Sequence, residues 1–302
     1  MKFLKFDDFL TENYESIMFD SSFEGCNLTE AAGLTNEVDD KIKFAIIMAT
    51  HKVADDIGRR SGREKYKPQL KVFKETIESI KKQNHKNWKL YLCADCYDGD
   101  EEIREILDSV LDKKDYWYFN LPKPGERDNP VVQKSGASHK LCGAKAWNTA
   151  LDAAKKDGVA YGIRMGHDDV WRPEHLEMHA KVHTQYPESK VVWGTTIKKR
   201  AKGEAKGSLK WPETNVNKVD YDNLTFREGN TADVYSWDIN SFKGLKWRSV
   251  DQKTSAPKRS NWIPGDLDMW MRMNDIIKDK EYKVTFFPNS TYRYRNSKGQ
   301  LP

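Results

Sequence analysis

The sequence lacks long apolar runs. No stretch approaches the roughly 18 consecutive apolar residues that a membrane-spanning helix requires. The first residues also lack the basic segment followed by an apolar segment that marks a secretory signal. We therefore expect a protein without a membrane span that stays in the cytoplasm.

Cysteine is scarce, with four residues in a chain of 302. Four scattered cysteines are too few for a disulfide framework in a chain of this length. Cys93 and Cys96 form a Cys-x-x-Cys pair, but no second pair supplies the other ligands of a zinc site. We interpret Cys93 as a buried thiol in a strand and Cys96 as a loop thiol.

The chain has enough apolar side chains to form a packed core. Its charge is distributed unevenly along the sequence. The chain is 38% hydrophobic and 12% aromatic, with a net charge of +5. Residues 1–40 hold ten acidic residues against Lys2 and Lys5, so the remainder is strongly basic. We expect residues 1–40 to be an acidic leader with a short helix near residues 5–18, and residues 41–302 to form the folded domain.

Short apolar runs alternate with helical patterns after residue 41. The β-branched run at residues 44–48 is typical of a buried parallel strand, and residues 68–83 have apolar side chains at helical spacing. This alternation predicts an α/β fold with a mostly parallel sheet flanked by helices. The further predicted elements are a strand at 88–95, a helix at 100–111, a strand at 116–121, a helix at 142–158 and a strand at 159–165.

Polar side chains follow three of these predicted strands. Thr50 and His51 end the first, Asp95 ends the second, and Asp168 and Asp169 follow the strand at 159–165. Ligands of open α/β sheets bind beyond the carboxyl ends of the strands, so we expect one crevice to contain these residues. An aspartate pair in such a place holds a divalent cation, or else forms a turn or a helix cap.

The order and spacing of these residues resemble the family 2 nucleotide-sugar glycosyltransferases of GT-A fold. The resemblance covers roughly residues 41–185 and returns at 261–297. It implies a GT-A, Rossmann-like sheet and a nucleoside-diphosphate sugar as the donor. The resemblance rests on Thr50, the helix ending at Gln83, Trp88, Asp95, Asn148 and the segment HDDVW. It implies that Thr50, His51, Asp95, Asn148 and Asp168 bind the nucleotide sugar.

The resemblance also implies a metal-dependent transfer that inverts the anomeric carbon. Mn²⁺ or Mg²⁺ held by Asp168 and Asp169 would neutralise the leaving diphosphate, and Asp266 would take the proton of the acceptor hydroxyl. Two positions depart from the family pattern: the first aspartate of the metal motif falls on Gly166, and the residue before the base, usually acidic, falls on Gly265. His167 beside Gly166 supplies a nitrogen contact or fills space.

The resemblance divides the domain into a nucleotide-sugar-binding part, 41–185, and an acceptor-binding part, 186–302. Two basic segments, 198–211 and 243–262, carry tryptophans at positions 211, 247 and 262. Such segments are solvated loops, sugar-stacking surfaces or DNA-binding surfaces. The candidate acceptor-binding or phosphate-binding residues are Trp262, Trp270, Arg293 and Arg295.

The leader suggests a biological setting. The segments NLTEAAG and FLTEN resemble the Leu-x-Glu cleavage sites of bacteriophage head-maturation proteases. A bacteriophage protein would act in the host cytoplasm or the virion, on a glycan, a protein or a modified base of phage DNA. The alternative function is a non-catalytic nucleic-acid-binding or packaged virion protein built on the same fold.

Three histidines recur every four residues in the segment after HDDVW. His175, His179 and His183 resemble a metal-binding stripe, but no acidic ligand accompanies them at a suitable offset. We expect them to form a solvated or a packing face of a helix.

Overall fold

The computed structural model describes residues 34–52, 69–126, 143–194, 196–198, 235–248, 265–286 and 292–294. Its strands form a seven-stranded sheet of order β3-β2-β1-β4-β8-β6-β9 and a three-stranded sheet of order β5-β10-β7. Several predictions concern residues outside these ranges. They are the helix at 5–18, the Leu-x-Glu sites, Trp211, Trp262 and Arg295.

Strand β1 (Phe44–Thr50) lies inside the large sheet and is parallel to both of its neighbours. These are β2 (Trp88–Ala94) and β4 (Tyr161–Arg164), and β3 (Tyr116–Asn120) pairs with β2 in parallel at the sheet edge. All residues of β1 are buried, as expected for a continuous apolar run between two helical layers. The predicted mostly parallel α/β fold is therefore confirmed.

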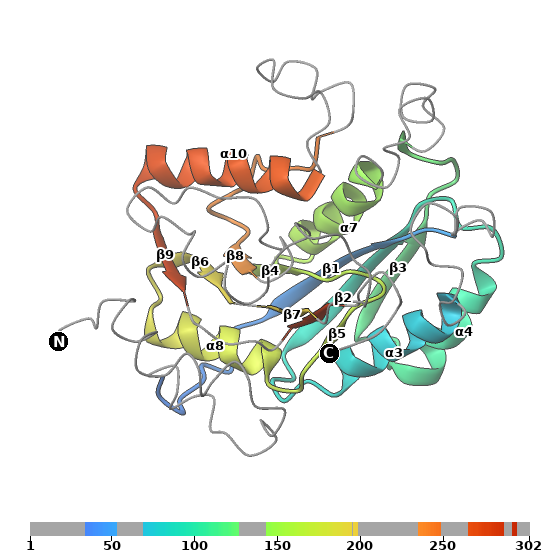
Figure 1. The fold of residues 1–302 in the computed structure, drawn as a ribbon, viewed down its shortest axis with the longest axis horizontal. Coiled ribbons are helices and arrows are strands. Elements are labelled where there is room, and N and C mark those ends of the chain that lie inside the picture. Colours follow the sequence, from blue (N-terminus) through green and yellow to red (C-terminus); the bar gives the residue numbers. More distant parts are fainter. Residues whose placement is uncertain are drawn as a thin grey trace, which may run out of the picture.

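Helices cover both faces of this sheet (Figure 1). α7 (Ala144–Lys156) and α10 (Gly265–Lys280) lie above it in that view. α3 (Gln69–Lys81), α4 (Glu101–Val110) and α8 (His175–Gln185) lie below it. Among the described residues, no helix is both long enough and apolar enough to cross a bilayer.

The second half of the chain completes the same sheet. β8 (Tyr235–Asp238) runs antiparallel between β4 and β6 (Ser189–Trp193), and β9 (Lys283–Phe286) pairs with β6 in parallel. A Cβ at Gly162 of β4 would lie 2.6 Å from the Trp237 ring of β8, so only glycine admits that ring. Strands from both sides of residue 186 therefore share one sheet and one core.

The small sheet brings a distant part of the chain next to the Asp168–Asp169 pair. β10 (Tyr292–Tyr294) runs antiparallel to β5 (Val170–Trp171) and parallel to β7 (Thr196–Lys198). In this register Arg293 pairs with Val170, the residue that follows the aspartate pair. The C-terminal segment is therefore positioned at the candidate site.

Candidate active site

The ends of β1 and β2 meet directly. The Asp95 N–H donates to the Thr50 carbonyl oxygen at 2.8 Å, which extends the ladder between the strands by one bond. Both residues are only 2% exposed, and the Thr50 hydroxyl oxygen has no hydrogen-bond partner within the described residues. A buried hydroxyl without a partner is costly, and a bound ligand can supply the missing bond.

The loop after β3 holds Asp95. Its Oδ1 accepts the Gly125 N–H at 2.7 Å, and a Cβ at Gly125 would lie 3.2 Å from both that oxygen and the Lys145 Cβ. The next residue, Glu126, accepts the N–H groups of Gly143 and Lys145 at 3.2 and 3.1 Å at the start of α7. Burial raises the pKa of Glu126, and the charge of Asp95 adds to the effect. The roles of Gly125 and Glu126 were not predicted from the sequence, where their only signal is a Gly-Glu pair shortly after a strand.

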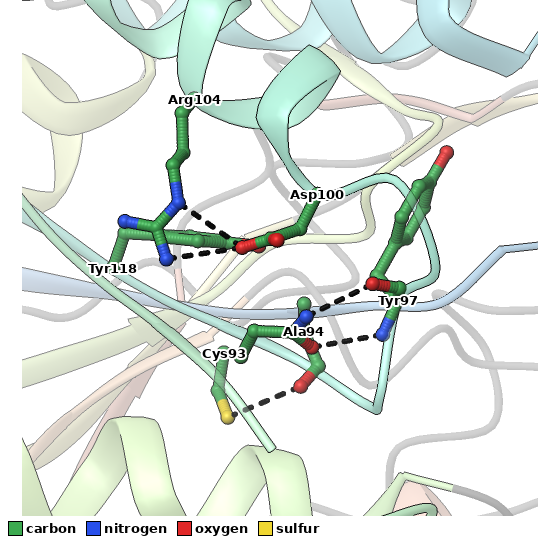
Figure 2. A network of polar contacts seen from close by, with 7 residues as sticks. Cys93, Ala94, Tyr97, Asp100, Arg104 and Tyr118 are labelled. Carbon is green, nitrogen blue, oxygen red and sulfur yellow. Dashed lines mark hydrogen bonds and ion pairs between the residues drawn. The ribbon is translucent and has the colours of Figure 1, made fainter. Parts of the chain in front are cut away.

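A second network stabilises the turn that follows Asp95. Figure 2 shows Arg104 of α4 and Tyr118 of β3 converging on Asp100, with Arg104 Nε and the Tyr118 hydroxyl each 3.1 Å from one carboxylate oxygen. The Tyr97 N–H donates to the Asn120 side-chain oxygen at 2.8 Å, and the Asn120 amide donates to the Tyr97 carbonyl at 2.9 Å. These bonds fix the turn to the sheet edge.

The turn after β4 contacts the end of β1. The rings of His51 and His167 meet edge to face, with their centroids 5.6 Å apart. Asp168 is partly exposed, whereas Asp169 is 2% exposed. A Cβ at Gly166 would lie 2.6 Å from Asp169 Oδ2 and 3.5 Å from Asp168 Oδ1, so both carboxylates approach this glycine. The three predicted strand ends thus meet at one edge of the sheet.

Helix α3 holds this turn from below. The Thr76 hydroxyl lies 2.7 Å from the Asp169 carbonyl oxygen, and Ser79 and Gln83 make hydrogen bonds to the backbone of residues 171–176. These roles were not predicted from the sequence. The available signal is the spacing of the three polar side chains, which places Thr76 and Ser79 on one face of α3 and Gln83 in line with them just beyond its last residue.

The carboxylates of the turn fit a divalent cation. Mg²⁺ and similar cations are commonly held by one or two carboxylates together with phosphate oxygens of the substrate. Among the described residues, no group of three or more His, Cys, Asp or Glu side chains is arranged to hold a metal ion. A cation here would therefore take its protein ligands from Asp168 and Asp169 and the remainder from a diphosphate and water.

Asn148 and Trp247 are joined by a structural contact. The Asn148 amide makes two hydrogen bonds with the backbone N–H and carbonyl of Trp247, both of 2.8 Å. Trp247 is 3% exposed and stacks on Trp147 with ring centroids 5.4 Å apart. Trp247 is therefore not a surface ring that could stack on sugars or bases. A contact between Asn148 and a nucleotide stays a prediction.

The acceptor-side residues lie on two elements. Asp266 and Trp270 are in the first turns of α10, and Arg293 is in β10. A carboxylate in the first turn of a helix is favoured by the helix dipole. The predicted roles of these three residues stay predictions.

The three histidines of α8 are core residues. His179 Nδ1 and His183 Nε2 each lie 2.9 Å from the Ser236 hydroxyl oxygen of β8, and the His175 ring lies against Trp171. Burial lowers the pKa of His175 and of His183 to about 3, and that of His179 well below its ordinary value. The prediction of a packing face is confirmed.

Comparison with known proteins agrees with this geometry. Residues 67–237 match the family Glycosyl transferase family 2. An uncharacterized glycosyltransferase of Acanthamoeba polyphaga mimivirus is 25% identical over 265 residues, which cover 86% of this chain and 97% of the relative.

Among solved structures, S. aureus TarS matches with a TM-score of 0.50 and 17% identity, over 83% of this chain and 36% of that chain. A mannosyltransferase of Pyrobaculum calidifontis in complex with GDP-Man and Mn²⁺ matches with a TM-score of 0.48 and 11% identity, over 85% of this chain and 58% of that chain. The chain thus spans less than two thirds of either solved chain.

The chain belongs to glycosyl transferase family 2, because the family match covers more than half of it. The protein is accordingly a glycosyltransferase, and its seven-stranded sheet flanked by helices is a GT-A fold.

Proposed function

We propose that the protein transfers a sugar from a nucleoside-diphosphate donor to an acceptor hydroxyl, with a divalent cation and with inversion of the anomeric carbon. One observation carries the proposal: Thr50, Asp95 and the Asp168–Asp169 turn lie at the carboxyl ends of three neighbouring parallel strands. Open α/β sheets bind nucleotides at such an edge.

The donor would lie across this edge. Asp95 has one carboxylate oxygen held by Gly125, and its carboxylate would accept hydrogen bonds from the nucleoside. The Thr50 hydroxyl, which has no hydrogen-bond partner among the described residues, would gain one, and His51 and Asn148 would complete the nucleotide contacts. A cation held by Asp168 and Asp169 would neutralise the charge that develops on the leaving diphosphate.

Asp266 is the proposed base. The acceptor hydroxyl attacks the anomeric carbon from the side opposite the diphosphate, so the new C–O bond forms as the bond to the phosphate oxygen breaks. The diphosphate leaves with the electron pair, and the carboxylate of Asp266 takes the hydroxyl proton. A single displacement of this kind inverts the configuration at the anomeric carbon.

The acceptor is proposed to be a glycan, a protein or a modified DNA base, bound near Trp262, Trp270, Arg293 and Arg295. The viral relative places one similar protein in a virus of an amoeba. A bacteriophage origin and a cytoplasmic or virion location stay predictions.

The alternative of a DNA-binding protein without turnover rests on the two basic segments. In the described part of the second segment, Lys246 is 2.8 Å from Asp152 and Trp247 is buried. These two side chains therefore do not favour DNA binding, and sugar transfer is the function that we propose.

Nucleotide release tests the proposal. The protein is incubated with Mn²⁺ and a panel of nucleotide sugars, with and without a chelator. We expect release from one donor, lost with chelator and in Asp168→Asn, but retained in Asp279→Asn, whose carboxylate is 71% exposed near the far end of α10. No release from any donor, together with salt-dependent DNA affinity, would favour the alternative.

A further inference from the structure

Gly166 stands where the resembled metal motif has its first aspartate, and the structure shows what a side chain would meet there. A Cβ at this position would be 2.6 Å from Asp169 Oδ2 and 3.4 Å from Asp169 Cγ. Carbon and oxygen atoms that are not bonded do not approach within 3.0 Å without displacing one another. Any residue other than glycine would therefore force the Asp169 carboxylate away from the strand end.

Asp169 has little freedom to yield. Its carbonyl oxygen lies 2.7 Å from the Thr76 hydroxyl, and the next residue, Val170, is paired with Arg293 in the small sheet. Asp169 is 2% exposed, so a rotated carboxylate would have to displace packed neighbours. Glycine at 166 and the inward carboxylate of Asp169 are therefore two parts of one arrangement.

We propose that Asp169 supplies the carboxylate that the family motif would place at position 166, and that Gly166 is the residue that permits this exchange. The inference rests on the proposed function, because it concerns the cation of that site. The Asp169 carboxylate lies within reach of the place where an aspartate side chain at 166 would begin, and Asp168 Oδ1 lies 3.5 Å from the same point.

This arrangement differs in its consequences from a simple loss of a metal ligand. If position 166 had merely lost its aspartate, restoring Asp there would strengthen cation binding. If Asp169 instead takes the place of the missing aspartate, Gly166→Asp adds a third carboxylate to the space that Asp169 occupies. Cation binding should then be weaker. Cation binding is then recovered only when the Asp169 side chain is also removed.

The test measures Mn²⁺ affinity of the full chain by electron paramagnetic resonance, with Mn²⁺ alone and with UDP or GDP added. Gly166→Ala and Asp169→Asn should each weaken binding about tenfold, the lower end of effects seen when groups around a metal site are altered. The double variant should be no weaker than Asp169→Asn, because both changes act through one carboxylate. Gly244→Ala is the matched control, since a Cβ there meets nothing within 4 Å.

A variant that moves the aspartate from position 169 to position 166 distinguishes the two explanations most clearly. Gly166→Asp combined with Asp169→Ala should bind Mn²⁺ at least several-fold more tightly than Gly166→Asp alone. Stronger binding in Gly166→Asp alone than in the unchanged protein would overturn the inference, as would additive losses in the double variant. Melting temperatures without metal identify variants that fail to fold, and Asp169→Asn, which keeps the side-chain volume, carries the test in that case.

Asp168→Asn separates this inference from the proposed function. If that variant abolishes Mn²⁺ binding while Gly166→Ala and Asp169→Asn bind normally, the exchange is wrong and the metal site stands. If all three bind normally, the metal site of the proposed function is wrong as well.

Discussion

Two neighbouring segments, the turn at 166–169 and helix α8, carry side chains that commonly bind metals. The turn holds its two aspartates at the sheet edge, and one of them is partly exposed. The three histidines of α8 are at most 1% exposed, and two of them share the Ser236 hydroxyl. The histidines therefore belong to the core, while Asp168 remains accessible to a ligand at the sheet edge.

The difference shows that location and partners, rather than residue type, decide the role of a polar side chain. A neutral histidine can remain in an apolar interior because it needs only one or two hydrogen bonds. A carboxylate in the same interior would carry a costly charge. In the proposed function a cation would offset this charge at the turn, whose backbone is bound by Thr76 of α3.

The largest expected effect comes from the turn. Asp168→Asn should lower metal-dependent sugar transfer about a hundredfold or more, because a charge interaction that stabilises the leaving group is lost. The melting temperature should change little, since Asp168 is partly exposed. Steady-state rates at saturating Mn²⁺ measure the effect. A rate within twofold of the unchanged protein would show that Asp168 contributes no more to transfer than the buried histidines do.

The histidines should act on stability rather than on transfer. Their pKa is lowered in the folded state, to about 3 for His175 and His183, so below about pH 6.5 the unfolded chain binds more protons. Stability is therefore complete above that pH and is lost as pH falls toward 3, by about 1.4 kcal/mol per pH unit for each histidine.

The variant His175→Phe tests this assignment, because it keeps an aromatic ring against Trp171 and removes one titrating group. Denaturant unfolding between pH 7 and pH 4 should show a pH dependence that is less steep by about one proton. Equal slopes for the variant and the unchanged protein would show that His175 does not remain neutral in the core.

Thr76 connects helix α3 to the turn, and its loss should have an intermediate effect. Thr76→Val keeps the shape of the side chain but removes the hydroxyl near the Asp169 carbonyl, which should reduce transfer about fivefold and cost about 1 kcal/mol of stability. Thr184→Val on α8 is the control, because its hydroxyl makes hydrogen bonds with Ala180 and Asp39, neither of which belongs to the turn. A loss of transfer in the control equal to that in Thr76→Val would contradict the anchoring role.

The smallest effect is expected at Glu126. Glu126→Gln places an amide N–H against one of the two N–H groups at the start of α7, so one hydrogen bond is lost and the loop that holds Asp95 loosens. Nucleotide affinity, measured by calorimetry with UDP and GDP, should fall about threefold. The exposed Glu101→Gln should leave it unchanged. Unchanged affinity in Glu126→Gln would confine this residue to helix capping.

Much of the fold could be predicted because its signals are local. The apolar run of β1 and the apolar side chains of α3 at helical spacing each depend on a few neighbouring residues. Cys93 was likewise predicted to be a buried thiol, and burial raises its pKa to about 12. The antiparallel β8 and the small sheet were not predicted, because their pairing joins residues far apart in the chain.

The sequence by itself determined which polar residues follow which strands, because a parallel α/β sheet places the ends of its strands at one edge. Only the tertiary structure decided the rest. It buried Trp247 against Trp147 and paired the Asn148 amide with the Trp247 backbone. It also placed the Asp169 carboxylate close to Gly166. These outcomes depend on atoms brought together from distant segments, whose close packing no local pattern of residues specifies.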